Sequence, residues 1–138
     1  MEFSTTADTI NKIMYIDDIT GAIITCAEAE GWKVDASIYY KEMTSYFEFS
    51  KFSPAGRDFS FSAEMKCTNI NSLIEHLEDY YEDFDVDYET YIWLDQWGHG
   101  KNGAPYSLRA VLEDSEAIEK MVEKILNAIK RMEVPEEY

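Results

Sequence analysis

The chain has 138 residues, of which 28 are acidic and 12 basic, so its formal net charge at pH 7 is −16. This excess of negative charge argues against a surface that binds nucleic acid or anionic membranes, and it favours attraction to basic protein surfaces. A hydrophobic share of 46% with 14% aromatic residues argues against disorder. The length predicts a single domain, residues 1–132, followed by a short tail, residues 133–138.

The cysteine content and the N-terminal sequence both bear on the cellular compartment. Cys26 and Cys67 are the only cysteines, and they form no CxxC motif. The first residues contain neither a basic region nor an apolar run, and no segment is long and uncharged enough to span a bilayer. We therefore expect reduced thiols, a cytoplasmic location and no membrane partner.

The N-terminal segment has the pattern of a helix. A capping box that opens at Thr5 is followed by apolar residues at helical spacing as far as Ala29. Gly31 suits the left-handed position that ends many helices, and Trp32 can then pack back on the last turn. Asp17, Asp18 and Gly21 interrupt the apolar face, so a kinked helix and two shorter helices are alternatives to one straight helix.

Residues 33–66 are rich in aromatic and β-branched side chains and predict three antiparallel strands. Their expected ranges are 33–41, 45–52 and 58–66. The third strand alternates most clearly, which predicts one buried and one exposed face. Residues 53–56, Ser-Pro-Ala-Gly, have the composition of a turn. The residues expected on the buried face of the third strand are Phe59, Phe61, Ala63 and Met65.

The segment 71–84 predicts an amphipathic helix that Asn69 or Asn71 can cap. Its apolar stripe consists of Leu73, Ile74, Leu77, Tyr81 and Phe84. The opposite face carries only acids: Glu75, Glu78, Asp79 and Glu82. At about 1.5 Å of rise per residue these charges lie roughly 3.5 Å apart along the axis, close to the ~3.4 Å phosphate spacing of one DNA strand. Acids four residues apart repel, at a cost of about 0.2–0.5 kcal/mol per pair.

Two more elements follow. Asp85 or Asp87 can cap a short helix through Leu94, and a strand over 88–94 is the alternative. Ser107 can cap a long amphipathic helix that continues to residue 132, with Glu113, Asp114 and Glu116 near its start and Lys130 and Arg131 near its end, as the helix dipole prefers. The fold expected is α+β: an N-terminal helix, a three-stranded antiparallel meander, and two or three C-terminal helices on one sheet face.

Two patterns suggest metal chemistry. The spacing of Asp83, Asp85 and Asp87 is that of the first ligands of a calcium loop, but Tyr88 stands where the loop needs glycine and Leu94 where it needs glutamate. His76 and His99 are the only histidines, and their spacing is not that of a zinc-binding helix. We expect no metal and no other cofactor, with a metal-dependent enzyme that uses these histidines and nearby acids as an alternative.

The glycine-rich run 98–105, Gly-His-Gly-Lys-Asn-Gly-Ala-Pro, is a further candidate. It lacks the earlier glycine and the following Ser or Thr of a phosphate-binding loop, so a connector between two helices is the favoured interpretation. Loops often carry function, so three of its side chains are retained as candidates. They are His99, Lys101 and Asn102. No nucleophile motif is present, and no catalytic residue is predicted.

Three blocks of the sequence resemble a known group of proteins. They are Phe-Ser-Pro-Ala-Gly-Arg-Asp-Phe at 52–59, Phe-Asp-Val-Asp at 84–87, and the glycine-rich run at 98–105 followed by Leu-Glu-Asp at 112–114. Together they look like small acidic proteins, mostly uncharacterised, that phages and conjugative elements of gut bacteria carry. The resemblance covers roughly residues 32–130 and brings no assigned catalytic residues. It implies a context in which acidic inhibitors of host defence are common, including DNA mimics and anti-CRISPR proteins.

The leading hypothesis is a non-enzymatic inhibitor that occupies the basic, nucleic-acid-binding surface of a host protein. Charge density across the acidic segment would provide the binding. An oligomeric or scaffold protein, with the aromatic sheet or the long last helix as its interface, is the alternative from another class. The residues expected to contact the partner are Glu75, Glu78, Asp79, Glu82, Asp83, Asp85, Asp87 and Glu89.

Overall fold

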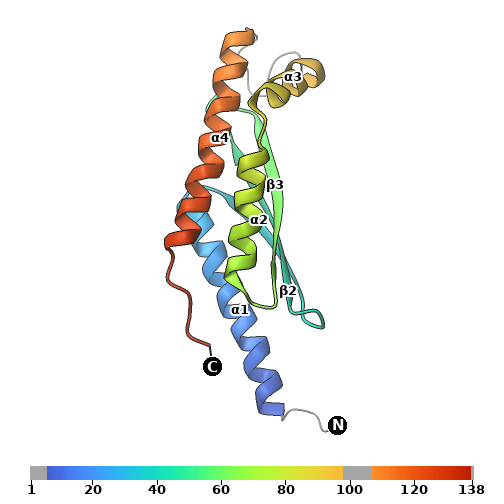
Figure 1. The fold of residues 1–138 in the computed structure, drawn as a ribbon, viewed down its shortest axis with the longest axis vertical. Coiled ribbons are helices and arrows are strands. Elements are labelled where there is room, and N and C mark those ends of the chain that lie inside the picture. Colours follow the sequence, from blue (N-terminus) through green and yellow to red (C-terminus); the bar gives the residue numbers. More distant parts are fainter. Residues whose placement is uncertain (1–5, 98–106, 138) are drawn as a thin grey trace.

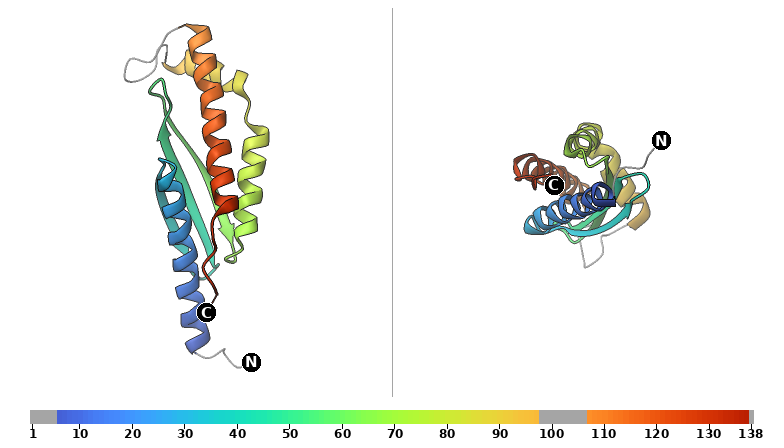
Figure 2. Two further views of the ribbon diagram at one scale, coloured as in Figure 1. Left: turned by 90° about the vertical axis from the view of Figure 1, so that its left-hand side faces the viewer. Right: turned by 90° about the horizontal axis from the view of Figure 1, so that it is seen from below.

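The computed structural model describes residues 6–97 and 107–137. Three helices cover one face of a three-stranded sheet, and a fourth lies at one end beside the start of the last helix (Figures 1 and 2). This arrangement confirms the α+β fold with three C-terminal helices. In chain order the elements are α1 (Thr6–Ala29), β1 (Lys33–Tyr39), β2 (Thr44–Phe52), β3 (Asp58–Lys66), α2 (Ile70–Asp83), α3 (Val86–Trp97) and α4 (Leu108–Arg131).

Helix α1 is one continuous helix over Thr6–Ala29, so the alternative of two shorter helices is wrong. Residues 17, 18 and 21, two aspartates and a glycine, lie on its exposed side, while Ile16, Ile19 and Ile23 on the other side are completely buried. The helix ends as the sequence predicts, since Gly31 has φ +91° and the amide of Trp32 donates to the Ala27 carbonyl over 3.1 Å. Thr5, the expected capping residue, lies outside the described residues.

The sheet has the strand order β1-β2-β3, and both strand pairs are antiparallel with unbroken register. The predicted alternation of β3 is confirmed, because Phe59, Phe61, Ala63 and Met65 are all buried. Trp32, which follows α1, packs edge-on against the ring of Phe61 with centroids 5.5 Å apart. The first strand ends at Tyr39, two residues earlier than expected, because residues 40–43 form the turn into β2.

Each of the last three helices begins at a side-chain cap. The Asn69 side chain accepts a hydrogen bond from the Asn71 amide, and Ser107 accepts one from the Ala110 amide. Asp85 Oδ1 accepts a hydrogen bond from the Tyr88 amide over 3.1 Å. Residues 86–97 form helix α3, so the alternative of a strand over residues 88–94 is wrong.

The hydrophobic core lies between the sheet and helices α1, α2 and α4. Leu73 and Leu77 of α2 and Ile118, Ile125 and Ile129 of α4 are almost completely excluded from solvent. A smaller apolar cluster, centred on Trp93 and Val111, joins α3 to α4. Within the two described ranges, no helix has the length and apolar character needed to cross a membrane.

Candidate functional site

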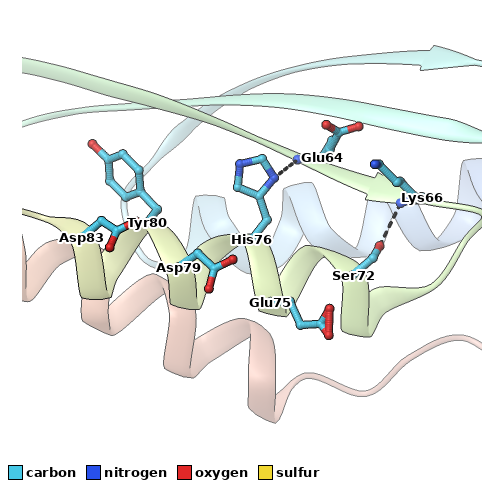
Figure 3. A pocket seen from close by; sticks show the side chains of 8 residues that line it. All are labelled: Glu64, Lys66, Ser72, Glu75, His76, Asp79, Tyr80 and Asp83. Atoms are coloured by element: carbon cyan, nitrogen blue, oxygen red, sulfur yellow. Dashed lines mark hydrogen bonds between the residues drawn. The ribbon is translucent and has the colours of Figure 1, made fainter.

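A groove of about 540 Å³ runs between the free edge of β3 and the exposed side of α2 (Figure 3). We call it the acidic groove, because four of its eight lining residues are carboxylates and only one is a lysine. The lining residues are Glu64, Lys66, Ser72, Glu75, His76, Asp79, Tyr80 and Asp83.

Side chains of α2 fix this helix to the edge of β3. The Lys66 amide donates to Ser72 Oγ over 2.8 Å, and the Glu64 amide donates to His76 Nδ1 over 3.3 Å. Ser72 Oγ in turn donates to the Asn69 carbonyl over 2.6 Å, at the start of the helix. Two edge amides of β3 that would otherwise need water are thereby satisfied, and the floor of the groove has a defined geometry (Figure 3).

The acids of α2 divide between two sides of the helix. Glu75, Asp79 and Asp83 follow one another at intervals of four residues, about 6 Å of helix rise, and all three line the acidic groove. Glu78 instead points toward α4, where its carboxylate accepts from Lys130 Nζ over 3.0 Å. Glu82 is exposed but does not line the groove. The four acids predicted to share one face therefore do not form a single row.

The acids beyond α2 have different surroundings. Asp85 caps α3, and Asp87 is exposed in its first turn. Glu89 pairs with Arg57 over 2.6 Å, and both side chains are largely buried, with exposed fractions of 20% and 13%. Because Arg57 neutralises it, Glu89 adds little to the negative surface. Of the eight residues predicted to contact a partner, the acidic groove thus brings together three, and β3 contributes Glu64, which sequence reasoning missed.

Tyr80 lines the acidic groove as a neutral phenol. Its ring stacks on Phe61 with centroids 4.5 Å apart. Burial raises the pKa of Tyr80 to about 12, with a further rise from the Glu89 carboxylate and an opposing effect of Arg57. The groove therefore combines four carboxyl side chains with one aromatic ring that stays uncharged through the physiological range.

A buried polar cluster holds the β2–β3 turn against α4 and α3. Ser53 Oγ donates to Asp114 Oδ2 over 2.6 Å, and the Ala55 amide donates to Asp114 Oδ1 over 2.9 Å. Ser53 Oγ also accepts from the Arg57 amide, and the Arg57 side chain reaches Glu89 of α3. Asp114, interpreted from the sequence as a dipole-favoured acid, is only 6% exposed and serves as an anchor for the turn.

This cluster unites parts of the three sequence blocks that carry the resemblance described above. The turn comes from the first block, Asp114 from the third, and α3 begins directly after the Asp85 of the second. The described parts of the blocks therefore lie together and join one end of the sheet to two helices. Sequence spacing contained a signal for Asp114, because it lies beside Ser115 within the buried stripe that includes Val111 and Ile118.

The remaining candidates concern metal and loop chemistry. His76 is half-buried and engaged with the β3 edge, and in the part of the chain that the structure describes no three His, Cys, Asp or Glu side chains are grouped so as to hold a metal ion. His99, Lys101 and Asn102 lie outside the described residues. Comparison of the chain with models of protein families, with curated proteins and with solved structures gave no match.

Proposed function

We propose that this protein is a non-enzymatic binding protein whose acidic groove takes up a basic, nucleic-acid-binding surface of another protein. The observation that carries the proposal is the row of Glu75, Asp79 and Asp83 beside Glu64, with Lys66 as the one lysine among the lining residues. A partner that presents lysine or arginine side chains about 6 Å apart could pair with successive members of this row.

The surroundings of the row favour recognition of an elongated, positively charged segment. The groove follows a helix and a strand edge, and the aromatic ring of Tyr80 lies among its lining residues (Figure 3). Arginine would suit this lining best, because its planar group pairs with carboxylates through two hydrogen bonds and also packs on aromatic rings. The class of partner we propose is a bacterial nuclease or other DNA-binding protein of host defence, met in the cytoplasm and inhibited by occupation of its DNA-binding surface.

The proposal is tested with a variant in which three carboxylates of the acidic groove are neutralised. Glu75→Gln, Asp79→Asn and Asp83→Asn together remove three charges without changing side-chain size. Each exposed ion pair contributes about 0.2–1 kcal/mol, so the three together should weaken binding roughly ten-fold. Binding is measured first with a fluorescent Arg-rich peptide by anisotropy at low and high salt, and then by inhibition of DNA cleavage across a set of restriction and CRISPR nucleases.

A matched control separates placement from net charge. Glu28→Gln, Glu113→Gln and Glu116→Gln remove the same number of charges from exposed positions on α1 and α4. We expect the control variant to bind the peptide as tightly as the wild type and to inhibit DNA cleavage equally well. The affinity of both proteins for the peptide should fall at high salt. Equal weakening by both triple variants would mean that net charge alone attracts the peptide, and the groove would then have no role.

A further inference from the structure

The backbone amides at the two edges of the sheet differ in their hydrogen bonding. At the β3 edge, Ser72 and His76 of α2 accept hydrogen bonds from the Lys66 and Glu64 amides. Those amides therefore point away from β2. In an antiparallel ladder the backbone groups of successive residues point alternately to the two neighbouring strands. In β2 the groups of residues 45, 47 and 49 accordingly point toward β3, and those of residues 44, 46, 48 and 50 point toward β1. It follows that Val34, Ala36 and Ile38 direct their amides and carbonyls to the outer edge of β1.

No backbone–backbone hydrogen bond among the described residues uses those outer groups of β1. Helix α1 packs over β1 from the core side, and no residue of the strand is buried: Val34 and Ile38 are half-buried, and Ala36 is exposed. The strand has seven residues, an unbroken register and no proline. Proteins that keep an edge strand solitary shorten, bulge or cover it, or place charges or proline on it; β1 carries the charges of Lys33 and Asp35 but has seven residues, no bulge and no proline.

The sequence of β1 is complementary to itself when two copies run antiparallel. With Ala36 opposite Ala36 of the second copy, Val34 lies opposite Ile38 on the core side, and all seven residues are paired. On the outer side Asp35 lies opposite Ser37, and Lys33 lies opposite Tyr39, so no like charges face each other. The three pairs that face the edge each exchange two backbone hydrogen bonds.

Neighbouring registers are worse. A shift that places Asp35 opposite its own copy brings two carboxylates together and leaves residues of the strand unpaired. A shift in the other direction, centred on Ser37, places Lys33 opposite Lys41 just beyond the strand. The register centred on Ala36 is therefore the one that combines full overlap with compatible charges.

We propose that two copies of this protein associate through antiparallel pairing of β1, which joins their sheets into one six-stranded sheet. A twofold axis then passes beside Ala36, as the isologous interface of a symmetric dimer requires. The two β3 strands become the outer edges of the joined sheet, so each acidic groove remains free. Such a dimer presents two grooves on opposite sides.

The first experiment measures self-association by sedimentation equilibrium from micromolar to millimolar concentrations. We expect a monomer–dimer equilibrium in the wild type and at least a ten-fold higher dissociation constant for Ala36→Pro, because proline removes the amides that pair at the twofold axis. Ala36→Thr keeps the amide and suits a strand, so this control should dimerise as the wild type does. A wild type that remains monomeric throughout, or a dimer that Ala36→Pro leaves unchanged, would overturn the proposal.

The second experiment does not depend on how the proline variant folds. In a background without Cys26 and Cys67, Ala36→Cys places two thiols at paired positions whose Cα atoms would be about 5.5 Å apart, within the range of a disulfide. Under mild oxidation we expect a disulfide-linked dimer to form at least ten-fold faster than with Ser60→Cys, which is exposed on β3. Equal rates at the two positions would refute the pairing, whatever the outcome for the acidic groove.

Discussion

Replacing Asp114 by alanine should destabilise the protein more than replacing any of the acids that line the acidic groove. The carboxylate is 6% exposed and accepts from the Ser53 hydroxyl and the Ala55 amide. Without it, the buried Ser53 hydroxyl and the partly buried Ala55 amide lose their acceptor, at about 1–3 kcal/mol each. Removal of a desolvated charge returns part of that cost. We expect a net loss of about 3 kcal/mol, a large part of the ~5–15 kcal/mol typical of a domain, and a fall in Tm of roughly 10 °C.

The assay is urea unfolding followed by circular dichroism, with calorimetry for Tm. Glu113→Ala removes the adjacent, exposed acid of α4 and should change the free energy of unfolding by no more than about 0.5 kcal/mol. In a double-mutant cycle, Asp114→Ala and Ser53→Ala should show a coupling of about 1 kcal/mol or more, because they share a hydrogen bond. If Asp114→Ala matched Glu113→Ala, or if the two losses were additive, the turn would not depend on this carboxylate.

Two further predictions concern the end of α1 and the phenol of the acidic groove. Gly31→Ala should lower the free energy of unfolding, measured with urea, by about 1–2 kcal/mol, because Gly31 has a φ of +91°. An unchanged urea midpoint of unfolding would contradict the left-handed cap. Absorbance at 295 nm should show Tyr80 titrating near pH 12. The pKa of Tyr80 is higher in the folded than in the unfolded protein. Its contribution to the free energy of unfolding is therefore complete below pH 10 and is lost as the pH rises toward 12. Tyr80→Phe should remove that part of the pH dependence, and an identical slope in both proteins would show that Tyr80 ionises normally.

Much of the fold follows from local rules that the sequence states directly. Caps at Asn69, Asp85 and Ser107, the glycine at 31 and the alternation of β3 each depend on residues within a few positions of one another. Local interactions of this kind are independent of how the elements later pack. The succession of one helical segment, three strands and further helices therefore follows from the amino-acid sequence, whereas the choice of a helix over a strand for residues 88–94 required the structure.

The composition of the acidic groove could not be predicted from the sequence, because it depends on contacts between residues that are far apart in the chain. The helical period places the acids of α2 away from Leu73 and Leu77, but it does not say which neighbour lies on each side. Only the packing of α2 between β3 and α4 assigns Asp79 to the groove and Glu78 to Lys130. The pair of Arg57 and Glu89 joins residues 32 positions apart, and its proximity is a consequence of the tertiary fold.

The charge pattern of α2 is hard to explain by stability alone. Glu75, Asp79 and Asp83 repel one another along the helix, at about 0.2–0.5 kcal/mol for each neighbouring pair, and no basic residue stands in the last turn to favour the dipole. Lys130 relieves Glu78 on the other side, yet within the described ranges no ion pair joins the row in the acidic groove to a cation of this chain. A sequence that only had to fold could place lysine at one of these exposed positions and gain stability. A positive partner of the kind proposed above would relieve this repulsion in the complex.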